Sequence, residues 1–446
     1  MLELSALVSG GVPVVVAGEK PVLCQILNRR DWLISATRKT RPDPSRTGML
    51  ERIPAQRQIR HDLYPQAPMT VPPLASLPIP DRLATSIDTM APAYLRRRLN
   101  LAGAPYQDGD TTTFVYVGRA DAVRIATFMS LFPPIPPLAQ VAGTDVWTVT
   151  VRLPTSARVE YKIEVTAEGK TEAIIDPLNP VTALDPFGAN SVTHGPGYAL
   201  PEWAEGAPYR SGAVEKLEIR SQAFDRTCTV GVYRPPVGDV TAPMPLVVIH
   251  DASDLVTFAD VRTALDGLIL GGFTRPFTAV LLDPVHRDVE YAASEQHSRF
   301  VVEEVLPAVR TDLGGAAPAA VIVAGASLGG VAALATGVHH PGVVHDLIVL
   351  SGSFVTALGG PWNRGPLFEP VIGFMSDFST GSIKPADRIW MACGAFESLA
   401  ADNRALVPVL EAHGSDVSYQ EPPDGHHWVS WRDSLGEALI DLIGDR

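Results

Sequence analysis

A serine in a glycine-framed turn is the residue whose setting points most directly to chemistry. Gly325-Ala326-Ser327-Leu328-Gly329 has the pattern G-x-S-x-G. It follows an apolar, β-branched run at 321–323, typical of a buried strand, and precedes small helix-favouring residues at 331–334. A tight strand-to-helix turn of this kind holds a serine hydroxyl in a strained, exposed position. The pattern predicts that Ser327 is a nucleophile and that the Leu328 amide donates to an oxyanion. The alternative is a glycine-rich turn with an incidental serine.

A serine hydroxyl also needs a base to take its proton and an acid to orient that base. In hydrolases with this turn, the acid and then the histidine follow the nucleophile along the chain. His426 and His427 come after a short strand at 417–420 and before the last helix, which is where the base is expected; we favour His426 of the two. Glu397, just past the strand at 388–394, is the predicted acid, with Asp402 as the alternative.

A second oxyanion donor is expected in the loop after the apolar strand at 247–249. The backbone amides of Ala252 and Ser253 are the candidates there. These residue types together predict acyl transfer from an ester. Ser327 attacks the carbonyl, His426 protonates the leaving alcohol, and water then releases the acyl group.

Strands that alternate with helices must position these residues. Segments 215–220 and 228–233 are predicted to form a leading antiparallel pair, and 245–250, 279–283, 321–323, 346–351 and 388–394 to form buried strands. This alternation predicts an α/β fold, with a mostly parallel sheet covered on both faces. We assign residues 209–446 to this catalytic domain.

The first half of the chain has a different pattern. Alternating segments at 111–117, 122–128, 146–153 and 159–165 predict an all-β, immunoglobulin-like sandwich; with the linker that follows, this domain is assigned to residues 96–208. Residues 1–95 are rich in arginine and proline and are predicted to be an extension with little core of its own.

Composition limits the partners. The chain has 446 residues with 36 Lys and Arg against 49 Asp and Glu, a net charge of −13, which argues against nucleic acid and anionic membranes. No apolar run reaches the ~20 residues of a membrane span. The apolar segment 6–18 lacks the basic flank of a signal peptide. Three distant cysteines show no metal-ligand spacing. We expect a cytoplasmic protein without a cofactor or metal that acts on a small-molecule ester.

Several segments together resemble the bacterial enterochelin (enterobactin) esterases, which are esterase D-like α/β-hydrolases. The matching pieces are a G-T-D-x-W turn at 143–147, a D-P-L-N-P linker at 176–180, the elbow at 325–330, a G-x-x-E acid position ending at Glu397, and the histidine loop at 425–432. The resemblance covers roughly residues 100–446. It implies a cytoplasmic enzyme that hydrolyses ferric tri-catecholate siderophores, with iron present only as part of the substrate. It supports Ser327, Glu397 and His426 as the triad.

The chain departs from the family pattern at three places. His250-Asp251-Ala252 stands where the family usually has L-D-G, and Asp424 and His427 stand where Gly and Asp are usual. The family's Asn-containing continuation after residues 287–291 is not matched cleanly. These positions border the expected substrate site, so the resemblance supports the ester chemistry more strongly than the catecholate substrate.

A ferric tri-catecholate is a bulky trianion, so its site should offer arginines. Arg287, Arg262 and Arg432 are the predicted contacts, and a structural ion pair is the alternative role for each. Two other functions remain open. A feruloyl or acyl-sugar esterase would expose aromatic residues such as Trp147 or Trp203, and an inactive binding protein would use the sandwich alone.

Overall fold

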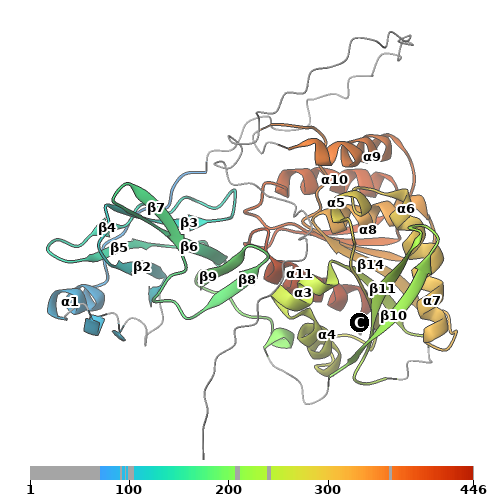
Figure 1. The fold of residues 1–446 in the computed structure, drawn as a ribbon, viewed down its shortest axis with the longest axis horizontal. Helices are drawn as coiled ribbons and strands as arrows, with labels where there is room; N and C mark the ends of the chain where they lie inside the picture. Colours follow the sequence, from blue (N-terminus) through green and yellow to red (C-terminus); the bar gives the residue numbers. More distant parts are fainter. Residues whose placement is uncertain are drawn as a thin grey trace, which may run out of the picture. The chain divides into compact units, whose positions relative to one another are not determined.

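An eight-stranded sheet organises the second half of the chain (Figure 1). We describe a computed structural model, in which residues 71–90, 93–95, 97–98, 105–205, 211–238, 243–360 and 364–444 are placed. The sheet has the order β10-β11-β13-β12-β14-β15-β16-β17. Its strands are β10 (Ala213–Ser221), β11 (Arg226–Arg234), β12 (Pro245–His250), β13 (Thr278–Leu282), β14 (Ala320–Ala326), β15 (Asp346–Leu350), β16 (Arg388–Ala392) and β17 (Asp416–Gln420).

The strand directions confirm the predicted α/β fold with its mostly parallel sheet. β10 and β11 are antiparallel to each other, and β11 is antiparallel to β13. From β13 through β17 every neighbouring pair is parallel. The carboxyl ends of these parallel strands therefore lie along one edge, where ligands and catalytic loops gather in open α/β sheets.

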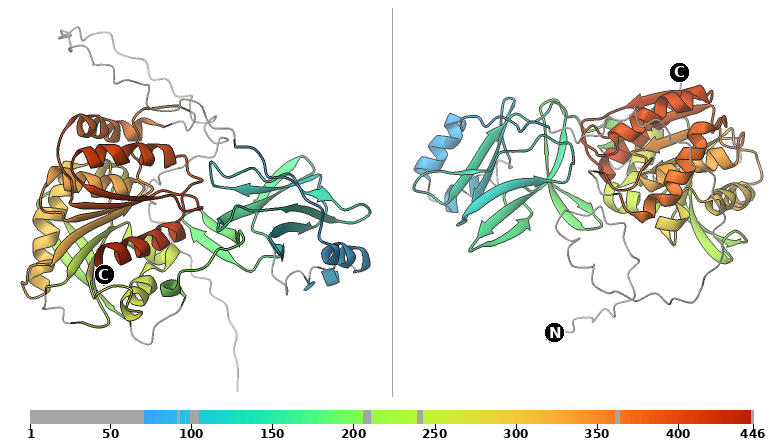
Figure 2. Two further views of the ribbon diagram at one scale, coloured as in Figure 1. Left: turned by 180° about the vertical axis from the view of Figure 1, so that it is seen from behind. Right: turned by 90° about the horizontal axis from the view of Figure 1, so that it is seen from above.

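Helices cover both faces of this sheet. They are α3 (Ala252–Ala259), α4 (Val261–Leu270), α5 (Arg287–Glu290), α6 (Glu295–Arg299), the π-helical turn η4 (Phe300–Val305), α7 (Leu306–Asp312), α8 (Leu328–His339), the 3-10 turn η5 (Pro366–Phe368), α9 (Glu369–Thr380), α10 (Ala400–Ala412) and α11 (Trp428–Ile443). Val247 and Ile249 pack with α4 and α11, whereas Leu246 and Val248 pack with α8 and α10. This alternation buries both faces of β12. The left view of Figure 2 shows α10 and α11 on opposite sides of the sheet.

Residues 106–194 form two antiparallel sheets. One has the order β1-β2-β5-β4, with β1 (Tyr106–Asp108), β2 (Thr111–Val117), β5 (Val146–Val151) and β4 (Ala139–Gln140). The other has the order β3-β6-β9-β8, with β3 (Ala122–Thr127), β6 (Arg158–Ala167), β9 (Gly188–His194) and β8 (Thr182–Asp185); β7 (Lys170–Ile174) also pairs with β6. Phe114 and Trp147 of the first sheet share a core with Val123 and Tyr161 of the second. The four predicted strands are present: β2 has the predicted bounds, and β3, β5 and β6 have ends shifted by one or two residues.

The predicted extension 1–95 needs correction at its end. Helix α1 (Asp81–Thr89) places Leu83 and Ile87 in a common core with Val115 and Val117 of β2. Residues 81–90, together with Leu95 of the same core, therefore belong to the two-sheet unit and add an apolar face to it. The rest of the predicted extension, up to residue 70, lies outside the described residues.

The described residues of the two-sheet unit and of the catalytic unit fall within one compact body. The Leu131 amide donates to the Phe396 carbonyl at 2.9 Å, and the Phe132 and Phe396 rings meet edge to face. Trp203, in the 3-10 turn η3 (Glu202–Ala204), packs against Gly267 of α4 and Gly436 of α11. Within the described ranges no helix combines the length and apolar character needed to cross a membrane.

Candidate active site

The turn between β14 and α8 has the strained geometry expected of a nucleophile elbow. Ser327 has φ 57° and ψ −121°, a conformation that side-chain-bearing residues rarely adopt. A Cβ atom at Gly325 would lie 2.0 Å from the Gly329 carbonyl oxygen, so only glycine lets strand and helix approach this closely. The turn presents the Ser327 hydroxyl at the carboxyl edge of the sheet.

The structure brings the three predicted triad residues together. His426 Nε2 lies 3.1 Å from Ser327 Oγ, and His426 Nδ1 lies 2.6 Å from Glu397 Oε2. Because an ionised carboxylate can only accept, the Nδ1–H donates to Glu397 and Nε2 is left to accept the serine proton. The two alternatives lie elsewhere: His427 pairs with Asp424, and Asp402 lies 4.0 Å from Arg364.

Glu397 is buried and held as a carboxylate. Its Oε1 accepts hydrogen bonds from Ser351 Oγ at 2.7 Å and from the Gly394 amide at 2.8 Å. Burial opposes its ionisation, but the neighbouring His426 and the hydrogen bonds from His426, Ser351 and Gly394 outweigh burial and lower the pKa of Glu397. The acid can therefore stabilise an imidazolium at neutral pH.

Two serines after β15 complete the site and were missed by the sequence analysis. Ser351 Oγ accepts a hydrogen bond from Trp431 Nε1 at 3.0 Å, and the Trp431 ring packs edge to face on His426. Ser353 Oγ lies 3.2 Å from Ser327 Oγ, and its amide donates to the Ser327 carbonyl at 3.0 Å. The available signal was the polar Ser351-Gly352-Ser353 stretch directly after a buried strand.

The predicted oxyanion donors differ in availability. Leu328 begins α8, so its amide has no acceptor inside the helix. Ala252 begins α3 at the end of β12, at the same edge of the sheet. The Ser253 amide instead donates to Asp283 Oδ1 at 2.9 Å, and its hydroxyl donates to Asp283 Oδ2 at 2.5 Å. Leu328 and Ala252 therefore remain as candidates, whereas the Ser253 amide is already engaged.

Each predicted substrate arginine has protein partners. Arg287 makes a two-point contact with Asp251, at 2.9 and 2.7 Å. Arg432 contacts Asp433 and the Ala259 carbonyl, and Arg262 donates to the Gly212 carbonyl. Arg287 and Arg432 thus form the structural ion pairs considered as their alternative role, whereas the contact shown for Arg262 is with a backbone carbonyl.

The aromatic residues that would indicate a sugar ester are buried. Trp147 is 8% exposed and donates to the Gly118 carbonyl, and Trp203 is 4% exposed between α4 and α11. Neither forms an exposed aromatic surface of the kind that binds a sugar ring.

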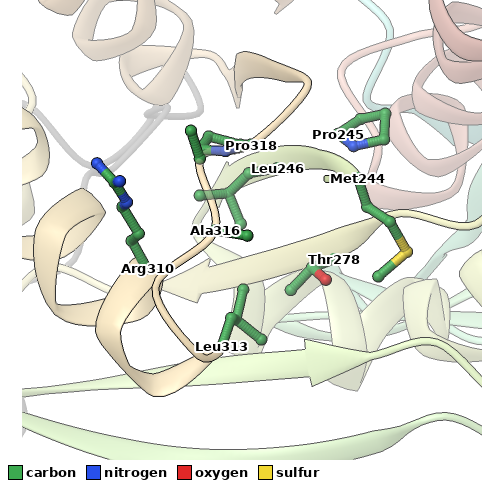
Figure 3. Close-up of a pocket in the computed structure, with 9 residues that line it drawn as sticks. Met244, Pro245, Leu246, Thr278, Arg310, Leu313, Ala316 and Pro318 are labelled. Carbon is green, nitrogen blue, oxygen red and sulfur yellow. The ribbon is translucent and has the colours of Figure 1, made fainter. Parts of the chain in front are cut away.

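Two hollows in the described structure lie away from the triad. One, of about 20 Å³, is lined by residues at the amino ends of β12 and β13 together with Arg310 and Leu313 (Figure 3). It has room for about one water and lies at the opposite edge of the parallel strands from Ser327. The other, of about 510 Å³, lies between α1 and the turn joining β4 to β5. Among the described residues, no group of three or more His, Cys, Asp or Glu side chains is arranged to hold a metal ion.

Comparisons with known proteins agree with this geometry. A family model described as "Putative esterase" matches residues 221–442. The Iron(III) enterobactin esterase of Escherichia coli O6:H1 is 26% identical over 343 residues, covering 68% of this chain and 81% of that protein. The Iron(III) salmochelin esterase of the same strain is 23% identical, covering 69% of this chain and 79% of that protein.

Solved structures show the same fold. The enterobactin esterase of Shigella flexneri, determined in the presence of enterobactin, matches with a TM-score of 0.61 at 24% identity, over 74% of this chain and 92% of that one. The ferric enterobactin esterase of Salmonella typhimurium matches with a TM-score of 0.62 at 21% identity, over 75% of this chain and 94% of that one. The family model and the relatives together show that the chain is a carboxylic ester hydrolase, similar to the enterochelin (enterobactin) esterases in sequence and with the same esterase D-like α/β-hydrolase fold.

Proposed function

We propose that this esterase acts through a Ser327–His426–Glu397 triad. The observation that carries the proposal is the unbroken series of contacts from Ser327 Oγ through the His426 ring to Glu397, at 3.1 and 2.6 Å. The elbow supports Ser327 as the nucleophile, because its strained backbone conformation costs free energy and conformations of this kind cluster at functional sites.

Each residue has one task in this reaction. His426 Nε2 takes the proton of Ser327 Oγ as the oxygen attacks the ester carbonyl. Glu397 holds the Nδ1–H tautomer and stabilises the imidazolium that results. The amides of Leu328 and Ala252 bind the oxyanion. His426 then protonates the leaving alcohol, and a water deprotonated by the same nitrogen hydrolyses the acyl-enzyme.

The proposed substrate is an ester of the ferric catecholate siderophore class. Its support is the set of relatives, which are named as enterobactin and salmochelin esterases. Arg287, Arg262 and Arg432 are the proposed contacts of this anionic substrate. Asp251, which pairs with Arg287, lies close to Gly329 of the elbow, so Asp251 links Arg287 to the turn that carries Ser327. Iron enters only with the substrate.

The two-sheet unit is proposed to be an immunoglobulin-like domain that contributes to substrate binding. Its contacts with the loop that holds Glu397 support this role. The family resemblance also supports a cytoplasmic location for the enzyme.

The test is a set of hydrolysis rates on ferric enterobactin, iron-free enterobactin, p-nitrophenyl acetate and methyl ferulate. We expect the highest kcat/KM on ferric enterobactin and a loss of about 10⁴-fold or more in Ser327→Ala. A fluorophosphonate should label the wild-type protein but not this variant. Retained hydrolysis in Ser327→Ala would refute the triad. Preference for the ferulate would replace the substrate, and a folded protein that neither hydrolyses nor labels would be a binding protein.

A further inference from the structure

The loop that carries His426 is packed against a strand of the two-sheet unit. Its Pro423 carbonyl accepts the amide hydrogen of Arg158 on β6 at 3.3 Å. Asp424 and His427 flank Gly425 and His426, and His427 Nδ1 lies 2.9 Å from Asp424 Oδ1. Asp424 Oδ1 also accepts the Gly425 amide at 2.7 Å. Both ends of this short segment are therefore tied down.

β6 presents two buried charges at this contact. Arg158 and Glu160 are 5% and 3% exposed, and Arg158 Nη1 donates to Glu160 Oε1 at 2.8 Å. Glu160 Oε2 accepts from Asn190 of β9 at 2.9 Å, which fixes the carboxylate. Removing the two charges of an ion pair from water costs free energy, which further hydrogen bonds and nearby opposite charges must offset.

The loop supplies that balance. Burial alone lowers the pKa of His427, but Glu160 and the hydrogen-bonded Asp424 outweigh burial and the opposing Arg158, so its pKa is raised. His427 therefore binds a proton more readily than a free histidine does. With that proton bound, the two positive groups Arg158 and His427 balance the two negative groups Glu160 and Asp424.

Other ionisable groups near this cluster are His194, Tyr198 and Asp433, each of which interacts with Arg158. Asp433 pairs with Arg432. Burial and Arg158 lower the pKa of His194 to about 4, so this ring adds no positive charge at neutral pH.

We propose that Arg158, Glu160, Asp424 and His427 form a charge-balanced clamp that positions His426 between Ser327 and Glu397. The inference rests on the triad proposed above. The clamp residues are positioning residues, since none of them touches the reacting atoms. The same loop also fixes the acid, because the Asp424 carbonyl accepts the amide of Phe396, the residue before Glu397, at 3.1 Å. Asp424 and His427 are positions where this chain departs from the family pattern.

The test compares His427→Asn, Glu160→Gln and the double variant. The asparagine amide can replace Nδ1 as donor to Asp424 while removing the charge, and the glutamine keeps the shape of Glu160. Each single variant leaves one buried charge without balance, and the double variant restores neutrality. We expect kcat on p-nitrophenyl acetate to fall about 10- to 100-fold in each single variant, with KM unchanged. The double variant should recover at least about tenfold over His427→Asn.

A spectroscopic readout separates positioning from general stability. The proton in the 2.6 Å contact between His426 and Glu397 should give a strongly downfield ¹H resonance in the wild type. We expect this resonance to be lost in the single variants and restored in the double. Asp110→Asn is the matched control, because it breaks an ion pair of the two-sheet unit whose members, Arg152 and Asp110, are 60% and 59% exposed. It should change neither kcat nor the resonance.

The outcomes distinguish the two proposals. Wild-type kcat and an intact resonance in either folded single variant would overturn the clamp, and so would a double variant no better than the singles. If His427→Asn does not fold, Glu160→Gln carries the test. Activity retained in Ser327→Ala would instead refute the proposed triad.

Discussion

At the scale of single residues, Ser351 links the acid of the site to the aromatic ring that supports the base. Its hydroxyl donates to Glu397 and accepts from Trp431, whose ring packs on His426. One small side chain therefore contacts both supports of the imidazole. A residue of this kind restrains geometry without entering the reaction.

Replacing Ser351 with alanine should weaken both catalysis and folding. Glu397 loses a donor, and the buried Trp431 N–H loses its acceptor, which costs about 1–3 kcal/mol of unfolding free energy. We expect kcat on p-nitrophenyl acetate to fall about tenfold, equivalent to ~1.4 kcal/mol of transition-state stabilisation. Ser353→Ala is the control, because its hydroxyl contacts Ser327 rather than Glu397. Equal effects of the two substitutions on kcat and stability would contradict this role for Ser351.

Replacing Glu397 with glutamine should test the acid directly. The amide keeps the size of the side chain but removes the charge that stabilises the imidazolium, so we expect kcat to fall about 10³- to 10⁴-fold. The parallel variant Asp402→Asn removes the alternative acid, which lies beside Arg364. It should keep nearly full activity in the same assay. An inactive Asp402→Asn enzyme beside an active Glu397→Gln enzyme would reverse the assignment.

At the scale of elements, the approach of α8 to β14 depends on a glycine. In Gly325→Ala the new methyl group would lie 2.0 Å from the Gly329 carbonyl oxygen, on backbone that cannot give way. We expect a loss of about 3 kcal/mol in the free energy of unfolding, measured in urea, together with loss of activity. Gly373→Ala is the matched control, since that exposed helical glycine of α9 has open space at its Cβ. It should stabilise the protein by about 0.5–1 kcal/mol. Similar losses in both variants would contradict the steric argument.

The order of elements and the convergence of Ser327, His426 and Glu397 were predictable because their signals are local. A β-branched run before G-x-S-x-G defines the elbow, and the chain order of acid and base then leaves few candidates. The engagement of Ser253 by Asp283 was not predictable, because it requires the carboxyl ends of β12 and β13 to lie side by side. Ser351 was missed because its contacts with Glu397 and Trp431 also join segments that are far apart in the sequence. The packing of α1 on β2 was obscured by a proline-rich composition that resembles an unstructured extension.

At the scale of the whole molecule, two histidines buried beneath the elbow couple the fold to pH. His250 Nδ1 lies 2.8 Å from the Ala324 carbonyl, so it carries the hydrogen, and His250 Nε2 accepts from His297 Nε2 at 2.9 Å. Because one of the two facing Nε2 atoms must lack a hydrogen, the two rings cannot both be protonated while this contact is kept. Burial lowers the pKa of His250 and, together with His250 and Arg226, holds the pKa of His297 well below its ordinary value.

The stability of the protein should therefore fall as the pH falls through the ordinary histidine range. Unfolded histidines bind protons below a pKa of about 6.5, whereas the folded pair does not, so acid favours the unfolded chain. The loss is at most about 1.4 kcal/mol per histidine for each pH unit. Urea unfolding at pH 7.5 and 5.5 measures it, with a His250→Leu/His297→Leu variant as the reference. The wild type should lose more unfolding free energy between the two pH values than the variant does. An equal loss in both proteins would show that the pair does not bind protons on unfolding in this range.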